Sequence, residues 1–137
     1  MWQFHELNPE IAFTCPVGKT KTHWEKSMQV EWDWRAGRTT TDITGFNEWE
    51  IDWGACPLHL IQEAGMFCEE YDSGFGWENV DLAYRMAKRG VKFMVDKENK
   101  AVAFDHDAFE PHPFRKKPND KLWQRRQKEI DKEFYSK

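Results

Sequence analysis

The chain has 137 residues, of which 39% are hydrophobic and 32% charged, and a formal net charge of −4 at pH 7. This length suffices for one domain with a hydrophobic core, and no stretch approaches the roughly 18 consecutive apolar residues that a membrane span requires. Residues 115–137 carry nine Lys or Arg against four Asp or Glu, a charge of +5, so residues 1–114 carry −9. Such an acidic body argues against nucleic acid as a partner, because nucleic-acid-binding domains present a basic face.

The numbers of tryptophan and cysteine residues further narrow the class of protein to which the chain can belong. Aromatic residues make up 15% of the chain and include eight Trp, more than ordinary usage. Trp side chains fill cores, and their flat faces also stack on sugar rings or bases. Cys15, Cys56 and Cys68 are odd in number and lack CxxC spacing, so we expect neither a disulfide framework nor a cysteine zinc site. With no signal-peptide pattern at the N-terminus, this predicts a reducing, cytoplasmic location.

In the first third of the chain the sequence predicts one buried strand and a long irregular segment. Residues 2–7 have the pattern of a helix end closed by Asn8-Pro9, and residues 11–15 (IAFTC) have that of a buried strand. Residues 17–47 combine glycines with many Thr, Lys and Arg and show little periodicity. We expect an irregular segment there, and segments of that length are commonly functional.

The middle of the chain opens with an alternating pattern. Residues 48–53 (EWEIDW) alternate charged and large apolar side chains, which predicts a strand with Trp49, Ile51 and Trp53 on its core face. The elements predicted next are a helix over residues 58–64 ending at Gly65, a loop over 65–77, a helix from near Glu78 to Arg89 with Gly90 as its stop, and strands over 91–95 and 101–105. The last is a helix over 121–135, capped by Asn119 or Asp120, with Trp123, Ile130 and Phe134 facing inward.

The helix that begins near Glu78 carries the most informative polar residues. Helical spacing puts Glu78, Asp81 and Arg85 on one face, so we expect a shared surface patch and an ion pair between Asp81 and Arg85. Glu78 and Asn79 fall in the first turn, where unsatisfied N–H groups stabilise an anion. An alternative reading is helix capping alone, with Trp77 packed against the protein.

The order of these elements resembles the second half of the GT-A glycosyltransferases. The family-2-like branch carries a G-W-E-D-x-D-L-x-x-R pattern, which GWENVDLAYR follows closely. Polypeptide N-acetylgalactosaminyltransferases and galactosyltransferases carry a related W-G-G-E-N or W-G-G-E-D element. The match covers about residues 1–107. It implies an α/β fold, the acceptor-side half of a GT-A domain with a small mixed sheet and flanking helices, over residues 1–114, followed by a basic helix over 115–137.

The resemblance also implies roles for single residues. Gly76, Trp77, Trp53 and Arg85 would bind substrate, and Glu78 would hydrogen-bond sugar hydroxyls. Asn79 falls where inverting relatives place the Asp that serves as catalytic base, and an amide cannot accept a proton at neutral pH. Three alternatives stay open: Glu78 or Asp81 takes that role, the reaction is of the retaining kind, or the domain is not catalytic.

The resemblance also implies a metal cofactor and a nucleotide-sugar donor. His106 matches the downstream His that ligates a divalent metal in some of these enzymes, which makes Mn²⁺ the expected cofactor. The relatives bind a nucleotide sugar with an N-terminal half ending in Asp-x-Asp. We find no such half before residue 1, so we expect the donor half either to come from a separate polypeptide or to be missing from this sequence.

Three functional readings follow. The first is the acceptor-binding, catalytic part of a metal-dependent glycosyltransferase that acts on a carbohydrate or glycosylated acceptor. The second is a non-catalytic carbohydrate-binding module. The third is a small metal-dependent hydrolase built on Asp105, His106, Asp107 and His112, which would require at least three of them to converge on one ion.

Overall fold

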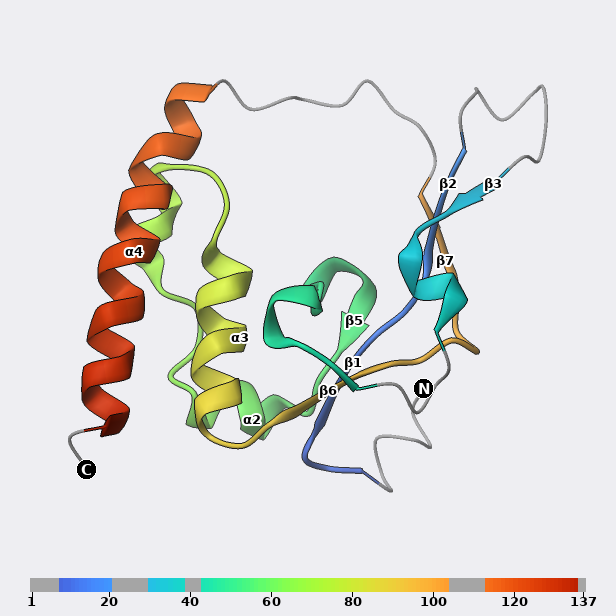
Figure 1. Cartoon of the computed structure of the whole chain (residues 1–137), viewed down its shortest axis with the longest axis horizontal. Coiled ribbons are helices and arrows are strands. Elements are labelled where there is room, and N and C mark those ends of the chain that lie inside the picture. Colours follow the sequence, from blue (N-terminus) through green and yellow to red (C-terminus); the bar gives the residue numbers. More distant parts are fainter. Residues whose placement is uncertain (1–7, 21–29, 39–42, 104–112, 136–137) are drawn as a thin grey trace. The chain divides into compact units, whose positions relative to one another are not determined.

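The computed structural model is mixed α/β and describes residues 8–20, 30–38, 43–103 and 113–135 (Figure 1). The chain divides into two compact units. Unit 1 comprises Met1–Pro57 and Lys92–Phe109, and unit 2 comprises Leu58–Val91 and Glu110–Lys137. Each unit is described by itself. The predicted helix end over residues 2–7 lies outside the described residues.

Unit 1 contains two small mixed sheets. Its strands are β1 (Ile11–Thr14), β2 (Val17–Thr20), β3 (Val30–Trp32), β4 (Ile43–Thr44), β5 (Gly54–Ala55), β6 (Lys92–Val95) and β7 (Ala101–Ala103). One sheet has the order β4-β6-β1-β5, with β1 parallel to β6 and antiparallel to β5. The other has the order β3-β2-β7, with β2 antiparallel to β3 and parallel to β7.

The core of unit 1 forms around β1, as its apolar run predicts. Ala12, Phe13 and Thr14 are fully buried, which is typical of a strand with neighbours on both edges and cover on both faces. Trp49 is buried beside it: its Nε1–H donates to the Phe13 carbonyl over 3.0 Å, and its ring centroid lies 5.9 Å from that of Phe93. The buried indole N–H is therefore satisfied within the core.

The structure of residues 17–53 contradicts two predictions. The segment 17–47 is not irregular, because it contains β2, β3, β4 and two short 3₁₀ helices, Trp34–Gly37 and Phe46–Glu48. These strands have only two to four residues, and β2 pairs with β7 far along the chain, so local periodicity cannot reveal them. The strand predicted over residues 48–53 is also wrong: a 3₁₀ helix, Ile51–Trp53, occupies half of it.

Gly54 gives a stability prediction for unit 1. A Cβ added there would lie 2.6 Å from the Phe13 carbonyl oxygen and 2.7 Å from the Glu50 carbonyl oxygen, and neither backbone atom can give way cheaply. We expect Gly54→Ala to lower the free energy of unfolding by about 1–3 kcal/mol, the usual cost of overpacking. Gly37→Ala is the matched control, because an added Cβ there meets no atom within 4 Å. Denaturant unfolding of both variants measures the difference, and equal effects would contradict the packing described here.

Unit 2 is helical in the part that the structure describes. Its elements are α2 (Leu58–Glu63), a 3₁₀ helix η4 (Glu69–Ser73), α3 (Glu78–Lys88) and α4 (Pro113–Tyr135). The predicted helix ends are confirmed for α2 and α3, where Gly65 and Gly90 adopt the left-handed conformation just beyond the last turn. In unit 1, the strands predicted over 91–95 and 101–105 are confirmed as β6 and β7, apart from residues 104 and 105, which the structure does not describe.

The last helix starts earlier than predicted. It begins at Pro113 and continues through Pro118, so Asn119 and Asp120 lie inside α4 rather than at its N-cap. Trp123 and Ile130 are buried as expected. Trp123 packs edge-on against Tyr84 of α3, with the ring centroids 5.5 Å apart. Figure 1 shows α4 running beside α3. Among the residues that the structure describes, no helix is long and apolar enough to cross a membrane.

Candidate functional site at the N-terminus of α3

The chain enters α3 through a constrained turn. Gly76 and Trp77 both have positive φ, 85° and 75°, and for a bulky residue such as Trp this conformation is rare and must be held by its surroundings. The Trp77 carbonyl then accepts the first hydrogen bond of the helix, from the Asp81 N–H at 2.9 Å. This turn brings Gly76, Trp77, Glu78 and Asn79 together at the end of α3.

The Trp77 indole is fixed from two sides by α4. Its Nε1–H donates to Oδ1 of Asp120 over 2.5 Å. Its ring stacks on Trp123, with centroids 5.7 Å apart and planes inclined by only 8°. The side chain is nonetheless 36% exposed. An aromatic ring that is held in one orientation and partly exposed is a ready binding surface, because little conformational entropy is lost when a ligand docks on it.

Asn119 of α4 fixes the loop that precedes Trp77. It is 1% exposed, and its Nδ2 donates to the carbonyl oxygens of Tyr71 (3.1 Å) and Gly76 (2.8 Å). One buried amide therefore ties both ends of the segment 71–76 to α4. The sequence predicted Asn119 or Asp120 as the N-cap of the last helix. Only the tertiary contacts identify it as the residue that positions the loop.

Asp81 lies in a buried charge cluster rather than on the surface. It is fully buried and accepts hydrogen bonds from Nε of Arg85 (2.7 Å), from Nε and Nη2 of Arg126 (2.9 and 3.2 Å), and from the Tyr71 hydroxyl (3.0 Å). The predicted Asp81–Arg85 ion pair is confirmed. The predicted surface patch of Glu78, Asp81 and Arg85 is wrong, because Arg126 and Tyr71 cover the carboxylate.

This cluster keeps Asp81 ionised. Burial by itself would raise the pKa of Asp81, but the hydrogen bonds from Arg126 and the charges of Arg85 and Arg126 outweigh it, so the net pKa is lowered. Burial, followed by the charge of Asp81, raises the pKa of Tyr71, so its hydroxyl remains a donor. Arg85 also donates to the Ala64 carbonyl, which joins the end of α2 to α3. The cluster therefore links α2, η4, α3 and α4 within unit 2.

Glu78 and Asn79 lie in the first turn of α3, as predicted, and both side chains are half-buried. Among the described residues, the Glu78 side chain makes no hydrogen bond or ion pair, whereas its backbone belongs to α3. Phe75, two residues before Trp77, is 44% exposed. The turn therefore carries a half-buried carboxylate directly after the exposed residue Trp77 in the sequence.

The other predicted site residues lie elsewhere. Trp53 belongs to unit 1, where it is half-buried at the edge of a pocket, so it is described apart from the α3 turn. His106 and its neighbours Asp105, Asp107 and His112 lie outside the described residues. Among those that are described, no group of three or more His, Cys, Asp or Glu side chains is arranged to hold a metal ion.

Comparison of the chain with known proteins yields no match to a protein-family model, to a curated protein sequence or to a solved structure. The resemblance of the GWEN element to glycosyltransferases therefore stays a prediction.

Proposed function

We propose that the chain is the acceptor-binding, catalytic C-terminal part of a nucleotide-sugar-dependent glycosyltransferase, with the donor held by a polypeptide outside residues 1–137. The acceptor would be a carbohydrate or a glycosylated molecule, and it would bind at the N-terminus of α3. The fold in this proposal is the acceptor-side half of a GT-A domain. The mixed α/β composition of the chain and the order of its elements are compatible with it.

One observation carries the proposal: the Trp77 indole is clamped by Asp120 and Trp123 directly before the Glu78 carboxylate. A sugar has apolar C–H faces and hydroxyls on its rim. An indole face binds the first by stacking, and a carboxylate accepts hydrogen bonds from the second. An exposed ring and a carboxylate on consecutive residues, both held by a rigid helix end, suit such a ligand.

In this proposal Glu78 carries the chemistry. Asp81 is a poor candidate for the base, because it is fully buried and its oxygens already accept hydrogen bonds from two guanidinium groups and a hydroxyl. Asn79 cannot accept a proton. Glu78 would accept the proton of an acceptor hydroxyl or orient the sugar, while Asp81 and Arg85 position the helix. A carboxylate base within hydrogen-bond reach of a hydroxyl is ordinary general-base chemistry.

The metal belongs to the same proposal and rests on the resemblance alone. His106 would be a protein ligand of Mn²⁺, and the ion would supply positive charge to the diphosphate of the donor. Imidazole is a suitable ligand for such an ion.

A non-catalytic carbohydrate-binding module is the second candidate. The clamped indole of Trp77 favours it equally, because stacking requires no catalytic group. The two candidates share sugar binding at Trp77 and differ in whether Glu78 supports transfer. A measurement of sugar binding at Trp77 therefore tests both candidates.

Trp77→Ala should weaken carbohydrate binding about tenfold or more, because it removes the stacking surface from the centre of the site. Binding is measured by calorimetry with methyl glycosides of glucose, galactose and N-acetylglucosamine, and with the glycans that bind best on an array. Asp120→Ala should have a smaller effect, since it loosens the indole without removing it.

Trp34→Ala is the matched control, because Trp34 is an exposed tryptophan of unit 1, at 44%. It should leave this binding unchanged. Wild-type protein that binds no glycan, or Trp77→Ala protein that binds as the wild type does, would refute both candidate functions.

A further inference from the structure

The solvent face of α4 carries four exposed lysines, which together form the lysine row: Lys117, Lys121, Lys128 and Lys132. They are spaced by four, seven and four residues, so they lie on one face of the helix along about 22 Å of its length. The buried residues Trp123 and Ile130 lie on the opposite side of α4. The lysine row is therefore separate from the face that packs within unit 2.

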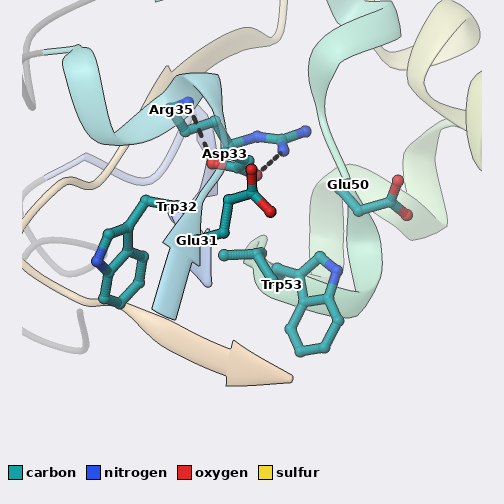
Figure 2. Close-up of a pocket in the computed structure, with 7 residues that line it drawn as sticks. Glu31, Trp32, Asp33, Arg35, Glu50 and Trp53 are labelled. Atoms are coloured by element: carbon teal, nitrogen blue, oxygen red, sulfur yellow. Dashed lines mark hydrogen bonds and ion pairs between the residues drawn. The ribbon is translucent and has the colours of Figure 1, made fainter. Parts of the chain in front are cut away.

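The lysine row differs from the cations that carboxylates neutralise. Arg35 of unit 1 donates to Asp33, as the dashed lines in Figure 2 show. Arg125 of α4 pairs with Glu70 and Glu129. Among the residues that the structure describes, none of the four ammonium groups of the lysine row has such a partner. The row therefore presents four positive charges that no described carboxylate pairs with.

The acidic residues nearest to the row along α4 are engaged with α3 and the turn before it. Asp120 accepts a hydrogen bond from the Trp77 indole, and Asp131 pairs with the ammonium group of Lys88 over 3.0 Å. Both carboxylates lie to one side of the row, since helical spacing separates them from it around the helix axis. The positive potential of the lysine row is therefore only partly offset by its neighbours.

The composition of this face selects the chemistry of the partner. Between the lysines it exposes Gln124 and Arg125 and no aromatic or large aliphatic side chain. Protein interfaces have an apolar core and are depleted in Lys, and nucleic-acid sites use Arg pairs or stacked aromatic rings. Lys is instead a compact, strongly hydrated charge, which suits attraction to many anionic groups at once. The headgroups of anionic lipids provide such groups, and four basic residues are enough to attract a helix to them.

The geometry also fits a flat surface. At about 100° per residue, the four lysines leave the helix within about 60° of one another around its axis, so all of them can contact one plane. Without apolar side chains to bury, the helix would lie on the headgroups rather than enter the acyl region. Residues 1–114 carry a charge of −9, which an anionic surface repels. This repulsion favours contact through α4.

We propose that the lysine row of α4 binds the surface of an anionic lipid bilayer by electrostatic attraction, without insertion. This surface is additional to the site at the α3 turn. It does not rest on the proposed function, because it requires neither sugar binding nor transfer.

The experiment sediments the full chain with vesicles of phosphatidylcholine containing about one third phosphatidylserine, and with vesicles of phosphatidylcholine alone. We expect binding to the anionic vesicles only. Binding should be lost between about 0.1 M and about 1 M salt, because the screening length falls from about 10 Å to about 3 Å. Lys121→Gln/Lys128→Gln should weaken binding about twentyfold, since each lysine near an anionic surface contributes about fivefold.

Two further variants control for charge and for position. Lys121→Arg/Lys128→Arg keeps both charges and should bind as the wild type does. Lys92→Gln/Lys97→Gln makes the same change in net charge in unit 1, at lysines that have no ion-pair partner among the described residues. It should leave vesicle binding unchanged. Circular dichroism verifies that each variant is folded.

Three results would overturn the proposal. The first is no binding to anionic vesicles, or equal binding to vesicles of phosphatidylcholine alone. The second is an equal loss of binding in the Lys92→Gln/Lys97→Gln variant, which would assign the attraction to net charge rather than to the lysine row. The third is tighter binding to duplex DNA or single-stranded RNA than to the vesicles, abolished by Lys121→Gln/Lys128→Gln, which would make nucleic acid the partner of the row.

Discussion

Asp81→Asn is expected to lower the free energy of unfolding by about 3–5 kcal/mol, the usual cost of removing one partner from a buried ion pair. The substitution preserves size but leaves Arg85 and Arg126 facing each other without the carboxylate that both contact. The amide is neutral and has one acceptor oxygen in place of two, so its NH₂ group must face donors from which the carboxylate accepted, such as Nε of Arg126. Urea unfolding followed by circular dichroism measures the change.

Glu70→Gln is the matched control for this experiment. Glu70 pairs with Arg125, but both side chains are more than half exposed, so the pair contributes at most about 1 kcal/mol. Equal losses in the two variants would contradict the buried cluster around Asp81.

The pH dependence of stability gives a second readout of the same cluster. The lowered pKa of Asp81 means that its stabilising contribution is fully present above the ordinary carboxyl pKa, about 3.9, and is lost as pH falls through the lower native value. Wild-type protein should therefore lose this part of its stability on acidification. The Asp81→Asn variant lacks the contribution at every pH, so the difference between the two proteins should shrink in acid.

Glu78→Gln is expected to reduce glycosyl transfer by about 10²- to 10⁴-fold, the usual contribution of a general base. The amide keeps the size of Glu78 and its half-buried position but cannot take a proton. The assay combines the chain with the donor-binding half that the proposal requires, a panel of nucleotide sugars and Mn²⁺, and follows the release of the nucleotide. Acceptor affinity should fall less than turnover, since Trp77 still provides the stacking surface.

Asn79→Asp is the companion variant. If the reaction is inverting and its usual base has been lost, a carboxylate at position 79 should raise transfer. If the reaction is retaining, it should raise nothing and should lower activity through repulsion with Glu78. If the Glu78→Gln variant loses thermal stability but retains transfer and sugar binding, the Glu78-Asn79 pair only caps the helix.

Local signals in the sequence predict the elements on which the site stands. The apolar run of β1, the stripe of α3 and the glycines after α2 and α3 each lie within one segment, so their structure can be inferred from a short window. The contacts that build the site cannot be inferred that way. Asp120 reaches Trp77, and Arg126 reaches Asp81, across more than 40 residues of sequence.

Unit 1 was less predictable for the same reason. Its strands β2 to β5 are two to four residues long and are defined by pairing with distant partners, so neither period nor length identifies them. The buried face predicted from Trp49 and Trp53 is correct in part. The two residues lie in or at the end of short 3₁₀ helices, however, and not in a strand. The pocket beside Trp53 depends on residues from three separate segments.

The most direct test of the central claim is ¹H–¹⁵N correlation NMR of the chain titrated with the same methyl glycosides. The Trp77 indole signal is assigned through Trp77→Phe among the eight tryptophans of the chain. The account predicts that this signal and the backbone amide signals of Glu78 and Asn79 shift together and saturate at one ligand concentration. If these three signals stay fixed while the protein remains folded, carbohydrate does not bind at the N-terminus of α3 and the central claim is wrong.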